Sequence, residues 1–99
     1  MSTEEIIEEK TVVNLQPPKL WKVIFLNDDS TSMELVIELL MKVFKHSETE
    51  ANEITLEIHT TGSGVAGVYA YEIAEQKGIE ATMIARKNGA PLRIQVEPE

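Results

Sequence analysis

The sequence contains no cysteine among its 99 residues. Disulfide bonds, thiolate catalysis and cysteine-ligated zinc are therefore excluded, and this absence is compatible with a reducing compartment. Long apolar runs are also missing, since no stretch approaches the roughly 20 residues of a membrane-spanning helix. The chain opens with Met1-Ser2-Thr3-Glu4-Glu5, which is acidic where targeting peptides are basic. We expect a cytoplasmic protein that makes no contact with a membrane.

Basic side chains are few: nine lysines and arginines face 17 aspartates and glutamates, for a net charge of −8. This sign argues against a protein that neutralises the phosphates of nucleic acid or anionic lipid. A cationic ligand, or a basic surface on another protein, fits the charge better. Solubility alone is an equally ordinary reason for acidity.

The length and the hydrophobic content of 42% indicate one folded domain with a small core. Residues 1–18 differ from the rest, with four glutamates in the first nine positions and Pro17-Pro18 at the end. We expect residues 1–18 to form a flexible N-terminal extension and residues 19–99 to form the domain.

Residues 20–26 are rich in β-branched and aromatic side chains and precede the turn-forming run at residues 27–30. This pattern predicts a buried strand. Thr31 and Glu34 have the spacing of a capping box, and apolar residues then recur at helical intervals, which predicts a helix from about 32 to 45.

Ser47 and Glu50 repeat the capping-box spacing, so a second amphipathic helix is expected to close near His59. A loop is expected at residues 60–64 and a short strand at residues 65–68.

A third helix is expected from about Tyr69 to Lys87, and Gly78 lies on its stripe of small residues, which suggests close contact with the sheet. Asn88-Gly89 would cap this helix, and residues 92–96 alternate as a half-buried strand. The expected order is β-α-α-β-α-β: an α+β sandwich in which three helices cover a three-stranded antiparallel sheet.

Several chemical motifs are incomplete. The glycines of residues 62–67 have the spacing of a dinucleotide-binding loop, but a helix precedes them and a strand follows, which is the wrong context. Residues 27–38 resemble a calcium loop that lacks its required glycine. A nucleophilic Ser63 or Thr61 would have no fixed base, and a metal site from Asp28, Asp29 and His59 would offer one nitrogen ligand. We therefore expect no enzyme, no metal and no cofactor.

Asn27, Asp28 and Asp29 follow the first strand, and His59 ends the second helix. Turn formation and a favourable helix-dipole position are the ordinary explanations for these residue types. A functional alternative is that a carboxylate, an amide oxygen and a neutral imidazole accept the three N–H donors of an ammonium group. Apolar side chains on the two helices would either wall a slot beside that cluster or simply belong to the core; they are Met33, Val36, Thr55 and Ile58.

The sequence closely resembles the ClpS family of adaptors, which deliver N-degron substrates to the ATP-dependent proteases ClpAP or ClpCP. The resemblance rests on Leu-Trp-Lys-Val-Ile-Phe-Leu-Asn-Asp-Asp at residues 20–29, Thr-Ser-Met-Glu at 31–34, Ile58-His59 and Gly67-Val68, and it covers about residues 19–97. It implies a non-enzymatic, monomeric adaptor that recognises a free N-terminal Phe, Tyr, Trp or Leu.

The resemblance also implies roles for individual residues. Asn27, Asp28 and His59 would hold the substrate's α-ammonium group, with Asp29 shaping the loop. Met33 would gate the side-chain pocket against β-branched Ile and Val. The rest of the pocket would be lined by Thr31, Val36, Leu39, Thr55 and Ile58.

The helical face that bears Glu72 and Lys77 would dock on the N-terminal domain of a ClpA- or ClpC-type unfoldase.

The sequence departs from the family pattern at Ser30, Ser32 and Ser63, and most importantly at Thr55, where the family often has methionine. A shorter, partly polar wall would reshape the pocket and change the ranking of Leu, Phe, Tyr and Trp as first residues of the substrate.

The alternative function is a general interaction module that docks on a larger assembly without recognising N-termini.

Overall fold

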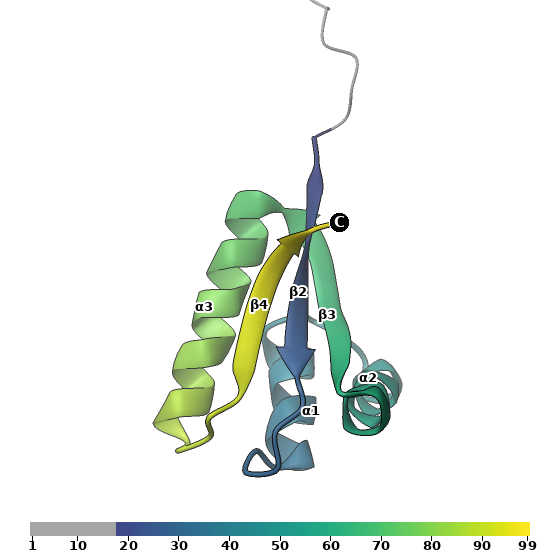
Figure 1. Ribbon diagram of the computed structural model, residues 1–99, viewed down its shortest axis with the longest axis vertical. Coiled ribbons are helices and arrows are strands. Elements are labelled where there is room, and N and C mark those ends of the chain that lie inside the picture. Colours follow the sequence, from purple (N-terminus) through teal and green to yellow (C-terminus); the bar gives the residue numbers. More distant parts are fainter. Residues whose placement is uncertain (1–17) are drawn as a thin grey trace, which may run out of the picture.

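The computed structural model describes residues 18–99, so the predicted N-terminal extension, apart from residue 18, lies outside the described residues. The order β-α-α-β-α-β is confirmed (Figure 1). The elements are β2 (Leu20–Leu26), α1 (Met33–Lys42), α2 (Glu48–Thr61), β3 (Ser63–Ala70), α3 (Tyr71–Lys87) and β4 (Arg93–Pro98).

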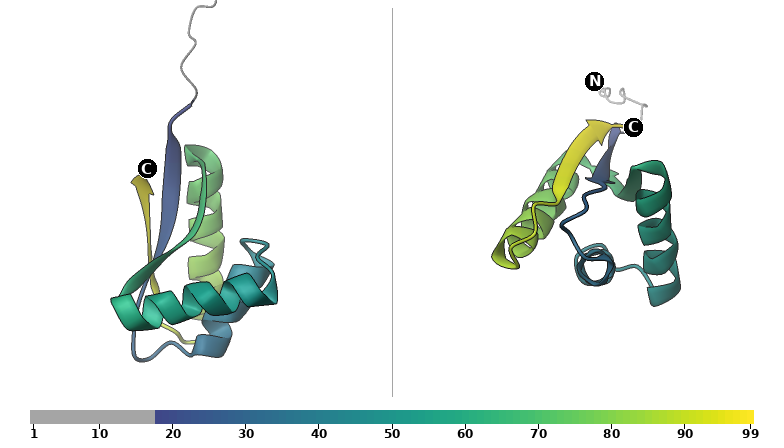
Figure 2. Two further views of the ribbon diagram at one scale, coloured as in Figure 1. Left: turned by 90° about the vertical axis from the view of Figure 1, so that its right-hand side faces the viewer. Right: turned by 60° about the horizontal axis from the view of Figure 1, so that its bottom comes forward.

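The sheet has the order β3-β2-β4, and β2 pairs antiparallel with both neighbours. All three helices lie on one side of it (Figures 1 and 2). Helix α3 packs against all three strands, α2 packs against β3, and α1 packs against α2 and α3. The predicted α+β sandwich is therefore confirmed. In residues 18–99, no helix is both long and apolar enough to cross a membrane.

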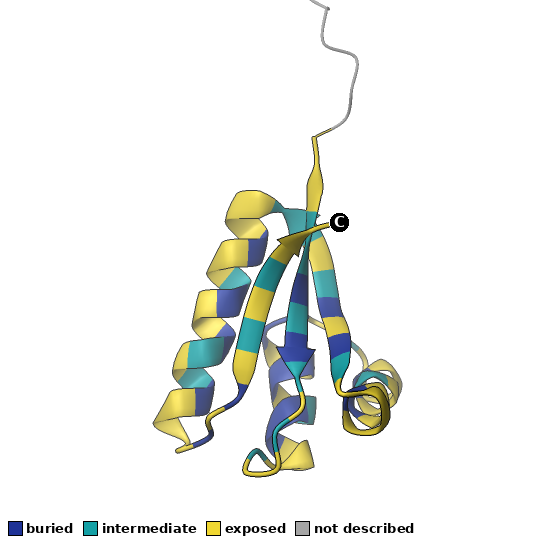
Figure 3. Cartoon of the chain, in the orientation of Figure 1, coloured by how far each residue is buried: buried dark blue, intermediate teal, exposed yellow. Residues whose placement is uncertain are grey.

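The central strand is buried on one face only. Val23 and Phe25 are fully buried, whereas the alternate residues Ile24 and Leu26 are half-buried. Buried and intermediate positions thus alternate along β2 (Figure 3). The prediction of a buried strand therefore holds for the helix-facing side. An unbroken apolar run does not reveal that one side of the sheet is left uncovered.

Helix α1 starts and ends differently from the prediction. Its N-cap is Ser32, whose hydroxyl accepts the backbone N–H of Leu35, so the predicted Thr31–Glu34 capping box is wrong. The helix ends at Lys42 rather than Lys45, because Lys45 has a left-handed φ of 62° that a helix cannot accommodate.

The capping box of Ser47 and Glu50 at the start of α2 is confirmed. The helix continues to Thr61, two residues beyond the predicted end, and stops at Gly62 with φ 99°. Glycine takes this left-handed conformation without the penalty of a Cβ atom.

Strand β3 is longer at both ends than predicted, and α3 begins at Tyr71 rather than Tyr69. The pairing of Leu20 with Ala70 extends the strand, and the α3 N-cap has no side-chain hydrogen bond that the sequence could have revealed. A register shift leaves Ala66 without a partner on β2.

Gly78 lies on the buried small-residue stripe of α3, as predicted, together with Ala74, Ala81 and Ala85. A Cβ atom placed on Gly78 would lie 3.4 Å from Cγ2 of Val96 and 3.8 Å from Cγ2 of Ile94. The small residues thus allow α3 to lie close to β4, and Ile94 and Val96 provide the inward side of that strand.

Candidate functional site

A cavity of about 220 Å³ opens where β2 ends, beside the start of α1 and the last turns of α2. The backbone N–H of Asn27 donates to the carbonyl of Gly62 at 2.9 Å, which ties the end of β2 to the end of α2. The cavity is lined by Leu26, Asn27, Asp28, Asp29, Thr31, Met33, Val36, Thr55, Ile58, His59 and Leu92.

The carboxylate of Asp28 is fixed by its own loop. Oδ1 accepts the backbone N–H of Ser30 at 2.9 Å, and Oδ2 accepts the hydroxyl of Thr31 at 2.7 Å. This is the turn geometry that Asp and Asn favour because their side chains bond to backbone two residues ahead. The carboxylate is thereby oriented before any ligand arrives.

The same contacts keep Asp28 ionised. The backbone N–H of Ser30 is the largest cause that lowers the pKa of this carboxyl below its usual value, and the Thr31 hydroxyl lowers it further. The guanidinium groups of Arg86 and Arg93 act in the same direction at longer range. Each carboxylate oxygen retains a lone pair after these bonds, so Asp28 can accept another donor.

His59 lies in the last turn of α2, on the exposed part of the cavity's lining. Asn27 and Asp29 flank Asp28 on the loop after β2. Asn27, Asp28 and His59 therefore line the same cavity, and an amide oxygen, a carboxylate and a neutral imidazole are each able to accept a hydrogen bond.

The rest of the lining is apolar and mostly buried. Val36, Ile58 and Leu92 are each at most 5% exposed, whereas Met33 is 43% exposed. Thr55 is 4% exposed, and its hydroxyl has no hydrogen-bond partner in the part of the chain that the structure describes. The cavity therefore combines a polar rim with an interior suited to a hydrophobic side chain.

The structure brings together nine of the ten residues predicted for the ammonium site and the side-chain pocket. The exception is Leu39, which is fully buried in the core and does not line the cavity. Leu26 and Leu92 line it without having been predicted. The register of Leu26 with Arg93 places Leu92 at this end of the sheet, a long-range pairing that no local pattern encodes.

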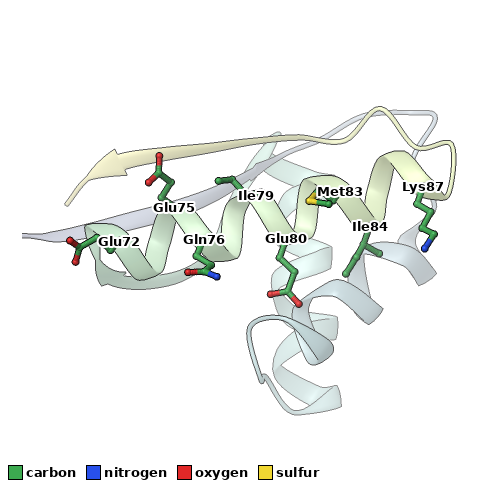
Figure 4. A pocket seen from close by; sticks show the side chains of 8 residues that line it. All are labelled: Glu72, Glu75, Gln76, Ile79, Glu80, Met83, Ile84 and Lys87. Atoms are coloured by element: carbon green, nitrogen blue, oxygen red, sulfur yellow. The ribbon is translucent and has the colours of Figure 1, made fainter.

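The two residues predicted for docking both lie on α3. Glu72 is exposed and lies at one end of a shallow surface hollow of about 720 Å³, with Lys87 at the other end (Figure 4). Lys77 is engaged within the protein: its Nζ donates to the carbonyl of Val43 at 2.9 Å and lies 5.3 Å from the ring centroid of Tyr69. The charge of Lys77 thus has a structural partner.

Among residues 18–99, no group of three or more histidine and acidic side chains is arranged to hold a metal ion.

Comparison with known proteins identifies one family. The sequence model for the ATP-dependent Clp protease adaptor protein ClpS matches residues 16–95. The ClpS adapter of Acetivibrio thermocellus is 41% identical over 99 residues, which is the full length of both chains. That of Deinococcus radiodurans is 46% identical over 82 residues, covering 83% of this chain and 73% of the relative.

A solved structure gives the same result. Agrobacterium tumefaciens ClpS2 bound to L-phenylalaninamide superposes with a TM-score of 0.80 at 42% sequence identity, and the match covers 84% of this chain and 100% of that one.

Proposed function

The chain belongs to the ClpS family of Clp protease adaptors, and from this premise we propose that it binds substrate proteins by a free N-terminal Phe, Tyr, Trp or Leu. As a member of this family it is an adaptor rather than an enzyme, and a Clp unfoldase is its partner. The binding site that we propose is the cavity at the end of β2.

The observation that carries this proposal is the fixed carboxylate of Asp28 at the rim of an apolar cavity. An α-ammonium group brings a positive charge and three N–H donors, which Asp28, Asn27 and a neutral His59 can accept. An internal peptide bond has one N–H and no charge, so it cannot satisfy the same rim. The cavity would therefore distinguish a chain terminus from an internal segment.

The interior supports recognition of a large apolar side chain. Val36, Ile58 and Leu92 would contact it, and burial of its surface would supply most of the hydrophobic binding energy. Met33 lies half-exposed at the mouth, where it would restrict branching at Cβ and thus exclude Ile and Val. The related A. tumefaciens ClpS2 was solved with L-phenylalaninamide, a compound with a free amino group and an aromatic side chain.

We place the docking surface for the N-terminal domain of a ClpA- or ClpC-type unfoldase on α3, at the face that bears Glu72 and Lys77. Because Lys77 already donates to Val43, Glu72 is the more accessible charge of the two. This surface is separate from the cavity, so docking and substrate binding would be compatible with each other. Glu72→Lys should weaken capture of the unfoldase while peptide affinity stays unchanged.

A peptide series that differs only in the first residue tests the proposal. Fluorescence anisotropy should show binding for Phe, Tyr, Trp and Leu, and affinities at least tenfold weaker for Ala, Val and Ile. Pulldown with the full chain should recover an unfoldase together with substrates that begin with a bulky residue. Equal affinities across the whole series would reject the proposal and favour an interaction module that does not read N-termini.

A further inference from the structure

Thr55 is the only buried polar residue in the described part of the chain, and its hydroxyl has no hydrogen-bond partner there. A threonine in a helix can donate to the carbonyl one turn before it. Two threonines of the same helix do so: Thr60 donates to Leu56 at 2.9 Å, and Thr61 donates to Glu57 at 2.8 Å. The Thr55 hydroxyl makes no such bond, and a buried hydroxyl without a partner costs stability.

The unpaired hydroxyl belongs to a residue that lines the cavity. Thr55 lines the proposed binding cavity among Val36, Ile58 and Leu92, all of them apolar and buried. It precedes His59 by one helical turn, which separates the two positions by about 6 Å along α2. A ligand whose ammonium group lies at the rim with His59 would thus extend its side chain toward Thr55.

We infer that the Thr55 hydroxyl selects for tyrosine at the first position of a substrate, by hydrogen bonding to its phenol oxygen; this inference rests on the proposed function of the cavity. The phenol oxygen is the side-chain atom farthest from the α-amino group. Both hydroxyls can donate and accept, so either direction of the bond is chemically available. Threonine in a helix can take either of two χ1 rotamers, so a change of rotamer can turn the hydroxyl of Thr55 toward the ligand.

Phenylalanine supplies the same ring without this oxygen and would leave the hydroxyl of Thr55 unpaired. A buried polar group that loses its partner discriminates strongly between otherwise similar ligands. The net strength of one neutral hydrogen bond corresponds to about a fivefold difference in affinity. Leucine would also leave the hydroxyl unpaired and should rank below tyrosine.

The experiment measures the affinities of Tyr-, Phe- and Leu-initiated peptides of otherwise identical sequence for the wild type, Thr55→Val and Thr55→Ser. The wild type should prefer Tyr to Phe by about fivefold or more. Thr55→Val has nearly the same shape without the hydroxyl, and its Tyr-to-Phe preference should fall to about one. Thr55→Ser keeps the hydroxyl and should keep a preference for Tyr. Thermal melts should show Thr55→Val to be at least as stable as the wild type, since it removes an unpaired buried group.

An N-acetylated copy of the Tyr peptide, tested on the wild type, separates the two levels of the proposal. If acetylation abolishes binding but Tyr and Phe bind equally, or if Thr55→Val keeps the wild-type ratio, the inference about Thr55 is overturned while the proposed function stands. If no free peptide binds, both are overturned.

Discussion

The hydroxyl of Thr31 donates to Oδ2 of Asp28 at 2.7 Å, and this bond holds the carboxylate in place at the rim of the cavity. Thr31 had the spacing of a helix cap, but Ser32 is the cap of α1, so the Thr31 side chain is available to the loop. The loop after β2 is thus organised around the group that we propose to bind the substrate's ammonium.

Replacement of Thr31 by valine should weaken binding of a Phe-initiated peptide by about three- to tenfold, because Asp28 loses one of the two donors that orient it. Anisotropy titration measures the effect. Thr82→Val is the matched control, since Thr82 lies on α3 away from the cavity and should leave the affinity unchanged. Equal affinities for both variants would show that the Thr31 bond has no part in binding.

Replacement of Asp28 by asparagine should weaken peptide binding by at least an order of magnitude, because the charge opposite the ammonium is removed at nearly constant shape. Glu57→Gln on the exposed side of α2 changes the net charge by the same amount and should bind normally. If the two variants lose affinity equally, the effect is due to overall charge and Asp28 is not the ammonium acceptor.

The hydrogen bonds of Asp28 should make the free energy of unfolding depend on pH. Its pKa is lowered in the folded state, first by the N–H of Ser30 and then by the Thr31 hydroxyl, so folding favours the ionised form. The resulting stabilisation is present above the ordinary pKa of 3.8 and is lost as the pH falls through the lower folded value. Urea unfolding of wild type and Asp28→Asn should therefore give a constant difference from pH 7 to about pH 5 and a shrinking one below pH 4. A difference that grows on acidification contradicts this sign.

Gly78→Ala should raise the free energy of unfolding by about 0.5–1 kcal/mol, because alanine removes the helix-interior penalty of glycine. The new methyl group would make ordinary contacts with Val96 and Ile94. Thermal melting should show an increase of a few degrees. Gly89→Ala is the contrasting variant: its φ of 74° is left-handed, so alanine there should destabilise. A loss of stability at Gly78 would mean that α3 and β4 are packed too closely to admit a methyl group.

Local sequence patterns predict the element order well, because strand composition, helical spacing and the Ser47 cap all act within a few residues. The boundaries that differ depend on conformations or pairings that the pattern does not encode. Lys45 ends α1 through a left-handed φ, and the pairing of Leu20 with Ala70 lengthens β3.

The site is predictable to the extent that its residues share a motif or a helical face. Asn27 to Asp29 are consecutive, and Thr55, Ile58 and His59 have helical spacing. Leu92 joins them only through the antiparallel pairing of β4 with β2. Leu39 lies on the apolar stripe of α1, but it is fully buried in the core and does not line the cavity. The unpaired state of the Thr55 hydroxyl likewise depends on three-dimensional packing.

Acetylation of the substrate's α-amino group tests most directly whether the cavity recognises a free N-terminus. A Phe-initiated peptide and its N-acetylated copy differ only in the ammonium group, and both can be titrated by anisotropy against the full chain at neutral pH. We predict that acetylation weakens binding by at least an order of magnitude, because it removes the charge and two of the three donors that face Asp28, Asn27 and His59. Equal affinities for the two peptides would contradict recognition of the N-terminus at this site.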